Sequence, residues 1–483
     1  MRRIAFVLLT GILLSTIPQA VAPSLAQPPT PGTSPTAAAT ATGTTTPVTM
    51  GFVLWVPIAV RNVGGDDSGI QVQNTGTTAA ILTIDYYYAD GNRAATSGPH
   101  TVQPSNPENF YQPNERGLPS GFDGSAVIRS SQPIAAIVNR VNYTAGSSTS
   151  SLTVPSSPNT SFYVPLVYGG RDDYFTTLSI QNTSPDPATY TLNLQPNAGT
   201  SGAAVTETVT VAPNAVRRLR VGTDIRVAGG FIGAANITGP QTLIAVGETR
   251  NTRTGVWLGY SGVPTGSATQ NAPLLFKNYD SNQWMSGAQV ANTSNATITL
   301  NATVRSRDDV RGFALPAVTL APNQGHFYDL STAAGLPENL VGSGVFTATG
   351  PIAVVVQETS APKREGMAYN GFADGSVRIS LPLIFKDFNG YDTGVQVQNL
   401  GTLPTTVTIS FFSATGLLQA SQTEVANPGG DAVNFYQPTN PALPTGFVGS
   451  ATVTSDGQPI VAIVNQVNYL RTGDAGLSYE GIN

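Results

Sequence analysis

The stretch Gly69-Ile70-Gln71-Val72-Gln73-Asn74 occurs almost unchanged a second time, as Gly394-Val395-Gln396-Val397-Gln398-Asn399. Weaker copies lie between the two, at 178–182 and 288–292. Apolar and polar residues alternate within each copy, which is the pattern of a β-strand with one buried face. The pattern predicts a core strand that occurs four times. Its glutamines should face outward, and its asparagine should lie in the buried phase, where the strand runs into a turn.

The rest of the chain repeats with the same period. Each copy follows a hydrophobic segment that carries a proline, and these prolines are spaced by 108, 108 and 109 residues (Pro57, Pro165, Pro273 and Pro382). A proline at the start of a strand suits a position where the ladder needs no donor. About seven short strands in roughly 105 residues, with turn signals between them, are typical of an immunoglobulin-like sandwich. We therefore predict an all-β fold with four tandem immunoglobulin-like β-sandwich domains.

The N-terminal region has the composition of a targeting segment followed by a spacer. Two arginines precede a short apolar run at 4–17, and small residues follow it, which predicts a signal peptide at 1–26. Residues 27–50 form an uncharged linker rich in Pro, Thr and Ala, with too few large apolar residues to fold. We expect secretion, with possible retention at the cell surface, and no transmembrane segment in the mature chain. The predicted repeats span 51–155, 156–266, 267–374 and 375–483.

Composition excludes several functional classes. The chain has no cysteine, which excludes disulfides and thiolate chemistry. Charged residues make up only 11% of the chain and the net charge is −5, which argues against nucleic acid or an anionic membrane as the main partner. The two histidines, His100 and His326, do not correspond between repeats, and neither has a partner at metal-ligand spacing. We predict no catalytic residue and no enzyme activity.

Acidic residues gather in the loop after the first strand of each repeat. Calcium needs six to eight oxygen ligands, and loops between domains often supply them. The alternative is that aspartates in these loops are turn formers. Calcium is therefore a weak candidate and no other cofactor is expected; the candidate ligands are Asp66, Asp67, Asp172, Asp173, Asp280, Asp387 and Asp392.

The asparagine that ends each copy of the motif has a predicted structural role. Because it lies in the apolar phase of the strand, its amide should be buried and should need hydrogen-bond partners. The following turn can supply them. We assign this role to Asn74, Asn182, Asn292 and Asn399.

Paired aromatic residues recur as Phe110-Tyr111, Phe327-Tyr328 and Phe435-Tyr436. Adjacent residues of a strand point to opposite faces, so one ring of each pair should be in the core and the other at an edge. The alternative is that the outer rings are exposed and stack on sugars.

The strand motif, the Asn-x-Gly that follows it and the aromatic-rich second strand resemble bacterial cell-surface immunoglobulin-like repeats, including the cell-adhesion-related kind. Repeat 1 has Asn74-Thr75-Gly76 and then Tyr86-Tyr87-Tyr88; repeat 4 has Asn399-Leu400-Gly401 and then Phe411-Phe412. Repeats 2 and 3 carry serine in place of the glycine. The resemblance implies an exposed structural or adhesive role and carries over no binding residue.

These observations lead us to expect a non-catalytic, secreted or cell-surface structural or adhesive repeat protein, built as a stalk of domains placed end to end. Its partner would be an extracellular surface, a matrix or a glycan. Two alternatives remain open: an extracellular array of carbohydrate-binding modules, and the accessory subunit of an extracellular enzyme.

Overall fold

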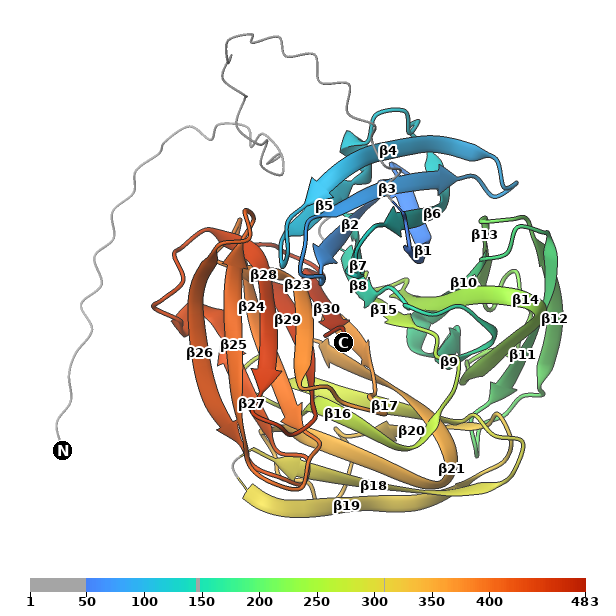
Figure 1. Cartoon of the computed structure of the whole chain (residues 1–483). Coiled ribbons are helices and arrows are strands. Elements are labelled where there is room, and N and C mark those ends of the chain that lie inside the picture. Colours follow the sequence, from blue (N-terminus) through green and yellow to red (C-terminus); the bar gives the residue numbers. More distant parts are fainter. Residues whose placement is uncertain (1–48, 145–147, 308) are drawn as a thin grey trace, which may run out of the picture. The chain divides into compact units, whose positions relative to one another are not determined.

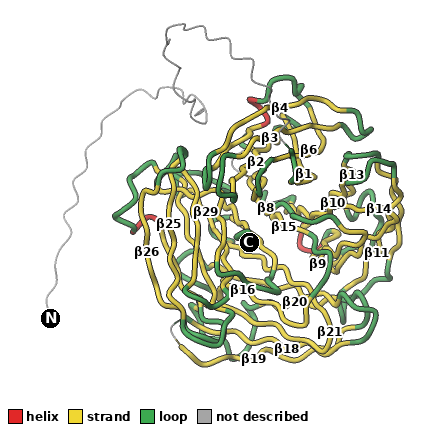
Figure 2. The backbone as a smooth tube through the Cα atoms, in the orientation of Figure 1, coloured by secondary structure: helices red, strands yellow, loops and turns green. Residues whose placement is uncertain are grey.

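The computed structural model describes residues 49–144, 148–307 and 309–483, and these residues form an all-β protein (Figures 1 and 2). The predicted fold class is confirmed. Helical structure in the described part is limited to three short 3-10 turns (Gln112–Asn114, Arg171–Asp173 and Gln437–Thr439). No helix there is long and apolar enough to span a membrane. The predicted signal peptide at 1–26 and the linker up to residue 48 lie outside the described residues.

In chain order the strands run from β1, in blue, to β30, in red, in Figure 1, and they are grouped here by the repeat in which each lies. Repeat 1 contains β1 (Phe52–Arg61), β2 (Asp66–Asn74), β3 (Ala80–Tyr87), β4 (Arg93–Val102), β5 (Pro107–Tyr111), β6 (Phe122–Ser130), β7 (Ile134–Asn142) and β8 (Ser148–Thr153). Repeat 2 contains β9 (Asn159–Gly169), β10 (Tyr174–Asn182), β11 (Ala188–Pro196), β12 (Val205–Val211), β13 (Val216–Arg220), β14 (Phe231–Asn251) and β15 (Trp257–Ser261). Repeat 3 contains β16 (Ser267–Lys277), β17 (Trp284–Asn292), β18 (Ile298–Ser306), β19 (Asp309–Leu320), β20 (Gly325–Asp329), β21 (Leu340–Ser360) and β22 (Glu365–Asn370). Repeat 4 contains β23 (Arg378–Lys386), β24 (Tyr391–Asn399), β25 (Thr405–Ser413), β26 (Leu418–Ala426), β27 (Ala432–Tyr436), β28 (Phe447–Ser455), β29 (Ile460–Asn468) and β30 (Gly476–Glu480).

Each repeat has two antiparallel sheet layers around one core; in repeats 1 and 4 they are separate four-stranded sheets, and in repeats 2 and 3 they are joined into one seven-stranded sheet. In repeat 1 the strand orders are β1-β6-β3-β4 and β5-β2-β7-β8, and repeat 4 has the same two orders with its own strands. In repeats 2 and 3 one long strand, β14 or β21, pairs with strands of both sheets. It takes the place of the separate strands β6 and β7 of repeat 1.

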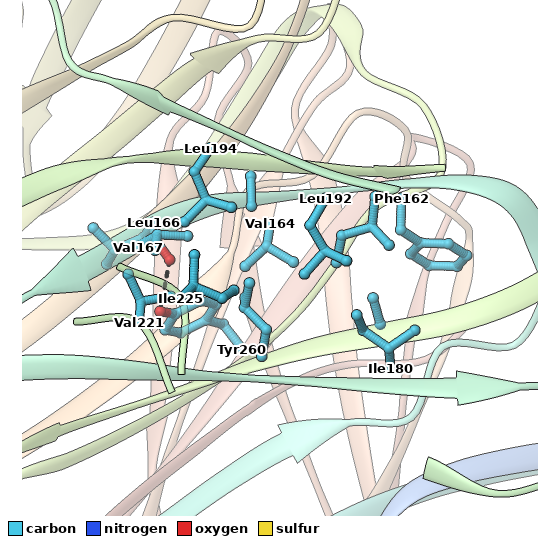
Figure 3. Packing of buried hydrophobic residues seen from close by; sticks show 14 of the residues in the cluster. Phe162, Val164, Leu166, Val167, Ile180, Leu192, Leu194, Val221, Ile225 and Tyr260 are labelled. Carbon is cyan, nitrogen blue, oxygen red and sulfur yellow. Dashed lines mark hydrogen bonds between the residues drawn. The ribbon is translucent and has the colours of Figure 1, made fainter. Parts of the chain in front are cut away.

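The motif strand is β2, β10, β17 or β24, and its apolar residues point into the core as its alternation predicts. Figure 3 shows this packing in repeat 2, where Val164 and Leu192 lie on one side of the core and Ile180 and Tyr260 on the other. All four side chains are buried. Because strand side chains alternate between faces, the motif's residues two apart necessarily share this core.

A tyrosine of the closing strand completes the core of three repeats. The backbone ladder of the first strand shifts register at each repeated proline. The tyrosine hydroxyl donates to the carbonyl oxygen of the residue after that proline, in the pairs Tyr260–Leu166, Tyr369–Leu274 and Tyr479–Leu383. Repeat 1 has Leu152 at this register position, opposite Val138 of β7.

Replacing one of these tyrosines by phenylalanine should lower stability. In wild-type protein the Tyr479 hydroxyl donates to the Leu383 oxygen at 2.6 Å and accepts from the Leu383 N–H at 3.1 Å. Tyr479→Phe keeps the ring but leaves both buried backbone groups without a partner, which costs about 1–3 kcal/mol. Urea denaturation measures the change, and Tyr87→Phe, at a half-buried tyrosine of β3, is the control. Equal midpoints for both variants would contradict the prediction.

The four closing strands β8, β15, β22 and β30 are joined in a closed circuit within the compact unit Val48–Asn483. Residues at one register position carry it: Thr153, Ser261, Asn370 and Glu480. Ser261 donates its hydroxyl to the Thr153 carbonyl and exchanges two hydrogen bonds with the Asn370 side chain, at 3.0 and 2.6 Å. The Asn370 N–H donates to the Glu480 carboxyl. The Thr153 hydroxyl donates to the Glu480 carbonyl oxygen at 3.0 Å and accepts the Glu480 N–H at 2.9 Å, which closes the circuit.

A second layer of the circuit is apolar. The residues opposite these four on the neighbouring strand are Ile137, Val246, Val355 and Ile463. Each belongs to the core cluster of the preceding repeat, and Ile137 of repeat 1 belongs to that of repeat 4. The end-to-end stalk expected from the sequence is therefore wrong. At the closing strands, polar groups form hydrogen bonds across repeats and apolar side chains pack into the core of a neighbouring repeat. An extended chain of domains would leave both kinds of group exposed.

The motif glutamines differ from expectation for the same reason. They do not face solvent: Gln71, Gln73, Gln181, Gln289, Gln396 and Gln398 are all buried. Gln181 donates to the Ala126 carbonyl of repeat 1 at 3.2 Å, and Gln289 exchanges two bonds with Asn197 of repeat 2, at 2.9 and 2.7 Å. The motif strand is thus buried on one face by its own core and on the other by the preceding repeat.

Candidate functional site

A cleft of about 520 Å³ lies where repeat 4 faces repeat 3, and we call it the 3/4 cleft. On the side of repeat 4 its wall consists of alternate residues of three neighbouring strands, because residues two apart in a strand share a face. On the side of repeat 3 the wall comes from β16, β17, β21 and β22 and from loops next to them. The lining includes Phe276, Tyr279, Trp284, Lys363, Gln396, Tyr436, Asn465 and Tyr469.

Aromatic rings stand at the rim of the 3/4 cleft. Tyr436 is 41% exposed and Tyr469 is 52% exposed, and their hydroxyl oxygens lie 3.0 Å apart. The Lys363 ammonium lies 4.9 Å from the centre of the Tyr469 ring. On the facing repeat, the ring of Tyr279 stacks on Phe276, with centroids 5.4 Å apart. Rings this exposed are available to a ligand.

The floor of the 3/4 cleft is polar and holds oxygens without partners. Gln396 is 3% exposed, and its Oε1 has no hydrogen bond among the described residues; the same is true of Asn465 Oδ1. Behind them, Asn465 Nδ2 donates to Glu358 Oε2 at 2.7 Å. Burial raises the pKa of Glu358 to about 8. Carbonyl oxygens of this kind accept hydrogen bonds, so the floor can receive hydroxyl donors.

A second cleft, of about 430 Å³, lies between repeats 2 and 3 and contains His326 and Phe327. One polar pair is satisfied within the protein, since the Tyr168 hydroxyl donates to Gln357 Oε1 at 3.0 Å. Burial lowers the pKa of His326. Among the described residues, no side chain lining this cleft has a buried polar atom without a partner, in contrast to Gln396 and Asn465 of the 3/4 cleft.

The strand pairing corrects the alignment of one aromatic pair. Phe110, Tyr328 and Phe435 occupy the same register position, opposite Ile70, Ala288 and Val395. Tyr328, rather than Phe327, is therefore the equivalent of the core ring Phe110. Phe327 is displaced by one residue along β20 and packs against the core of repeat 2. A short Phe-Tyr match does not reveal such a shift.

The seven calcium candidates are engaged in separate turns and ion pairs. Asp66 pairs with Arg140 at 3.0 Å, and Asp173 with Arg253 at 3.0 Å. Asp67 and Asp392 each accept the N–H of the residue five positions earlier, at 2.7 and 2.8 Å. Positive φ angles place Asp172, Asp173, Asp280 and Asp387 in turns. Across residues 49–144, 148–307 and 309–483, no three acidic or histidine side chains come together as metal ligands.

The four motif asparagines share one geometry. Each is fully buried, and its Nδ2 donates to the carbonyl oxygen four residues on, at 2.7–2.9 Å. The same nitrogen donates to the end of the fourth strand of the repeat, and Oδ1 accepts the N–H two residues on. Their structural role stays a prediction.

Comparison with known proteins gives little further information. No family model matches the chain, and no curated protein matches it significantly. Among solved structures, "Crystal Structure of Thermotoga maritima 1070" matches at 15% identity over 22% of this chain and 94% of that chain, with a TM-score of 0.20. A "tetra-tandem repeat in extending region of large adhesion protein" matches at 12% identity over 89% of this chain and 99% of that chain, with a TM-score of 0.11. TM-scores this low do not establish a shared fold.

Proposed function

We propose that this is a non-catalytic, exported protein with a structural or adhesive role outside the cell. It acts as one closed unit of four repeats, and it holds its partner in a cleft between repeats. The predicted signal peptide at 1–26 supports export. The observation that carries the binding role is the 3/4 cleft, where exposed rings lie near buried oxygens that have no partner among the described residues.

The role is tested with two forms of the chain expressed in a bacterium, one with residues 1–26 and one without. We expect the full chain to reach the exterior, cleaved near Ala26, and the shorter chain to stay in the cytoplasm. The purified mature protein, labelled with a fluorophore, should then bind to bacterial surfaces or to extracellular matrix material. Retention of the full chain in the cytoplasm, or no binding to either material, would overturn the proposal.

A further inference from the structure

We propose that the 3/4 cleft binds a neutral oligosaccharide; this rests on the extracellular binding role proposed above and gives that role its ligand class. The volume of about 520 Å³ falls in the range of about 300–1,000 Å³ that is common for small-molecule sites. The lining joins open aromatic rings to a floor of amide groups. A sugar matches both, because its C–H faces pack on rings and its hydroxyls bond to amides.

Asn465 differs from the residues at its register position in the other three repeats. The register position of Asn465 is occupied by Asn139, Glu248 and Gln357 in the other repeats. Each of these accepts a hydrogen bond from the protein: Asn139 from Ser151 at 2.7 Å, Glu248 from Arg140 at 2.7 Å, and Gln357 from Tyr168 at 3.0 Å. Asn465 instead turns its amide nitrogen toward Glu358, and its oxygen has no partner in the described part of the chain.

Gln396 differs in the same way from its counterpart in repeat 3, while the Ser179 hydroxyl at this position in repeat 2 is, like Gln396 Oε1, buried without a partner among the described residues. The equivalent of Gln396 in repeat 3 is Gln289, whose oxygen accepts from Asn197 of repeat 2 at 2.9 Å. Gln396 lines the 3/4 cleft, and its buried Oε1 has no such partner in the described structure. A buried acceptor without a donor costs free energy, so a ligand that brings hydroxyl donors gains from satisfying it.

The charges around the cleft favour a neutral ligand over an ionic one. Its lining contains two basic side chains, Arg307 and Lys363, and two acidic ones, Asp280 and Asp392. Lys363 also lies 3.8 Å from the carboxylate of Glu365. The signs balance, so no net field selects an anion or a cation.

The matched variants come from equivalent positions in two repeats. Tyr469 of repeat 4 and Tyr143 of repeat 1 both follow the asparagine that ends their strand, β29 or β7, and both are exposed. Tyr143 lies outside the 3/4 cleft, under the Arg471 guanidinium, which is 4.0 Å from its ring centre. Tyr469→Ala therefore removes a ring from the proposed site, and Tyr143→Ala removes a comparable ring elsewhere.

The test is titration calorimetry of the mature protein with maltotetraose, cellotetraose, mannotetraose, xylotetraose and, as acidic probe, tetragalacturonate. We expect at least one neutral probe to bind, with quenching of tryptophan fluorescence because Trp284 lines the cleft. Tyr469→Ala and Gln396→Ala should each weaken binding at least tenfold, and Tyr143→Ala less than twofold. Thermal denaturation checks that all three variants remain folded.

Three outcomes would overturn the inference: no neutral probe binds at millimolar concentration, only tetragalacturonate binds, or Tyr469→Ala and Gln396→Ala both bind as the wild type does. The labelled-protein assay separates this failure from failure of the proposed function. If Tyr469→Ala and Gln396→Ala still bind the extracellular material as wild type does, the adhesive role stands and the sugar site is wrong. If wild type does not bind that material, the adhesive role is wrong.

Discussion

Raising the pH from 5 to 9 should lower the free energy of unfolding of the wild-type protein, and Glu358→Gln should remove a large part of that loss. Glu358 is 0% exposed, and burial raises the pKa of its carboxyl from the ordinary value of 4.5 to about 8. The folded state therefore holds this proton more tightly than the unfolded chain does. The resulting stability is fully present below about pH 4.5 and is lost as the pH rises through about 8.

The expected loss from this one group is on the order of 4 kcal/mol, since each unit of pKa shift corresponds to about 1.4 kcal/mol. Other buried carboxyls act in the same direction: burial raises the pKa of Glu365 to about 7 and also raises the pKa of Asp474 and Glu480. Glu358→Gln separates one contribution from the rest, because glutamine keeps the shape and cannot ionise.

Urea denaturation at five pH values between 5 and 9, followed by tryptophan fluorescence, measures this dependence. Glu424→Gln, at an exposed position of β26, is the control and should keep the wild-type slope. A wild-type stability that is flat or rises over this range, or a Glu358→Gln variant that loses as much as wild type, would show that Glu358 is charged in the folded protein.

The second large effect is expected from Asn74→Ala. Asn74 Nδ2 donates to the carbonyl oxygens of Thr78 and Val102, both at 2.8 Å, and Oδ1 accepts the Gly76 N–H at 2.9 Å. Alanine leaves these three groups without their partner at a fully buried position. Because one unsatisfied buried group costs roughly 1–3 kcal/mol and water can reach part of the turn, we expect a loss on the order of 3 kcal/mol.

The same denaturation assay measures this loss at one pH. Asn109→Ala is the matched control, because Asn109 is an exposed asparagine of the same repeat, on β5 opposite Gln71. It should change stability by less than about 0.5 kcal/mol. If the two variants had equal midpoints, the motif asparagine would not have the structural role assigned to it.

The register of the motif strand could be predicted because it depends on neighbouring residues only. Alternation with period two places Ile70 and Val72 on one face, and a slip by one residue would turn both out of the core of their own repeat. The buried phase of Asn74 follows from the same count. Prediction from sequence alone fails for the aromatic pair of repeat 3. Phe327-Tyr328 has the same residue types as Phe110-Tyr111, but the pairing of β17 with β20 makes Tyr328 the structural equivalent of Phe110.

The candidate site could not be predicted in the same way. Asn139 and Asn465 lie in nearly identical segments, Ile137-Val138-Asn139 and Ile463-Val464-Asn465. One amide oxygen is satisfied by Ser151, and the other is buried without a partner among the described residues. The difference depends on which side chains approach from another strand or repeat, and no pattern within either segment records it.

The sequence by itself determined that this protein is all-β, that its strand motif occurs four times, and which residues of that motif face the core. Only the tertiary structure decided that the repeats close on one another and that the motif glutamines are buried. The physical reason is the distance along the chain over which each kind of interaction acts. Alternation of polar and apolar residues reports burial on one face of a strand, whereas a polar side chain can be satisfied by water or by a distant repeat. Thr153 bonds to Glu480 across 327 positions of sequence, and that contact is fixed only when all four repeats have folded.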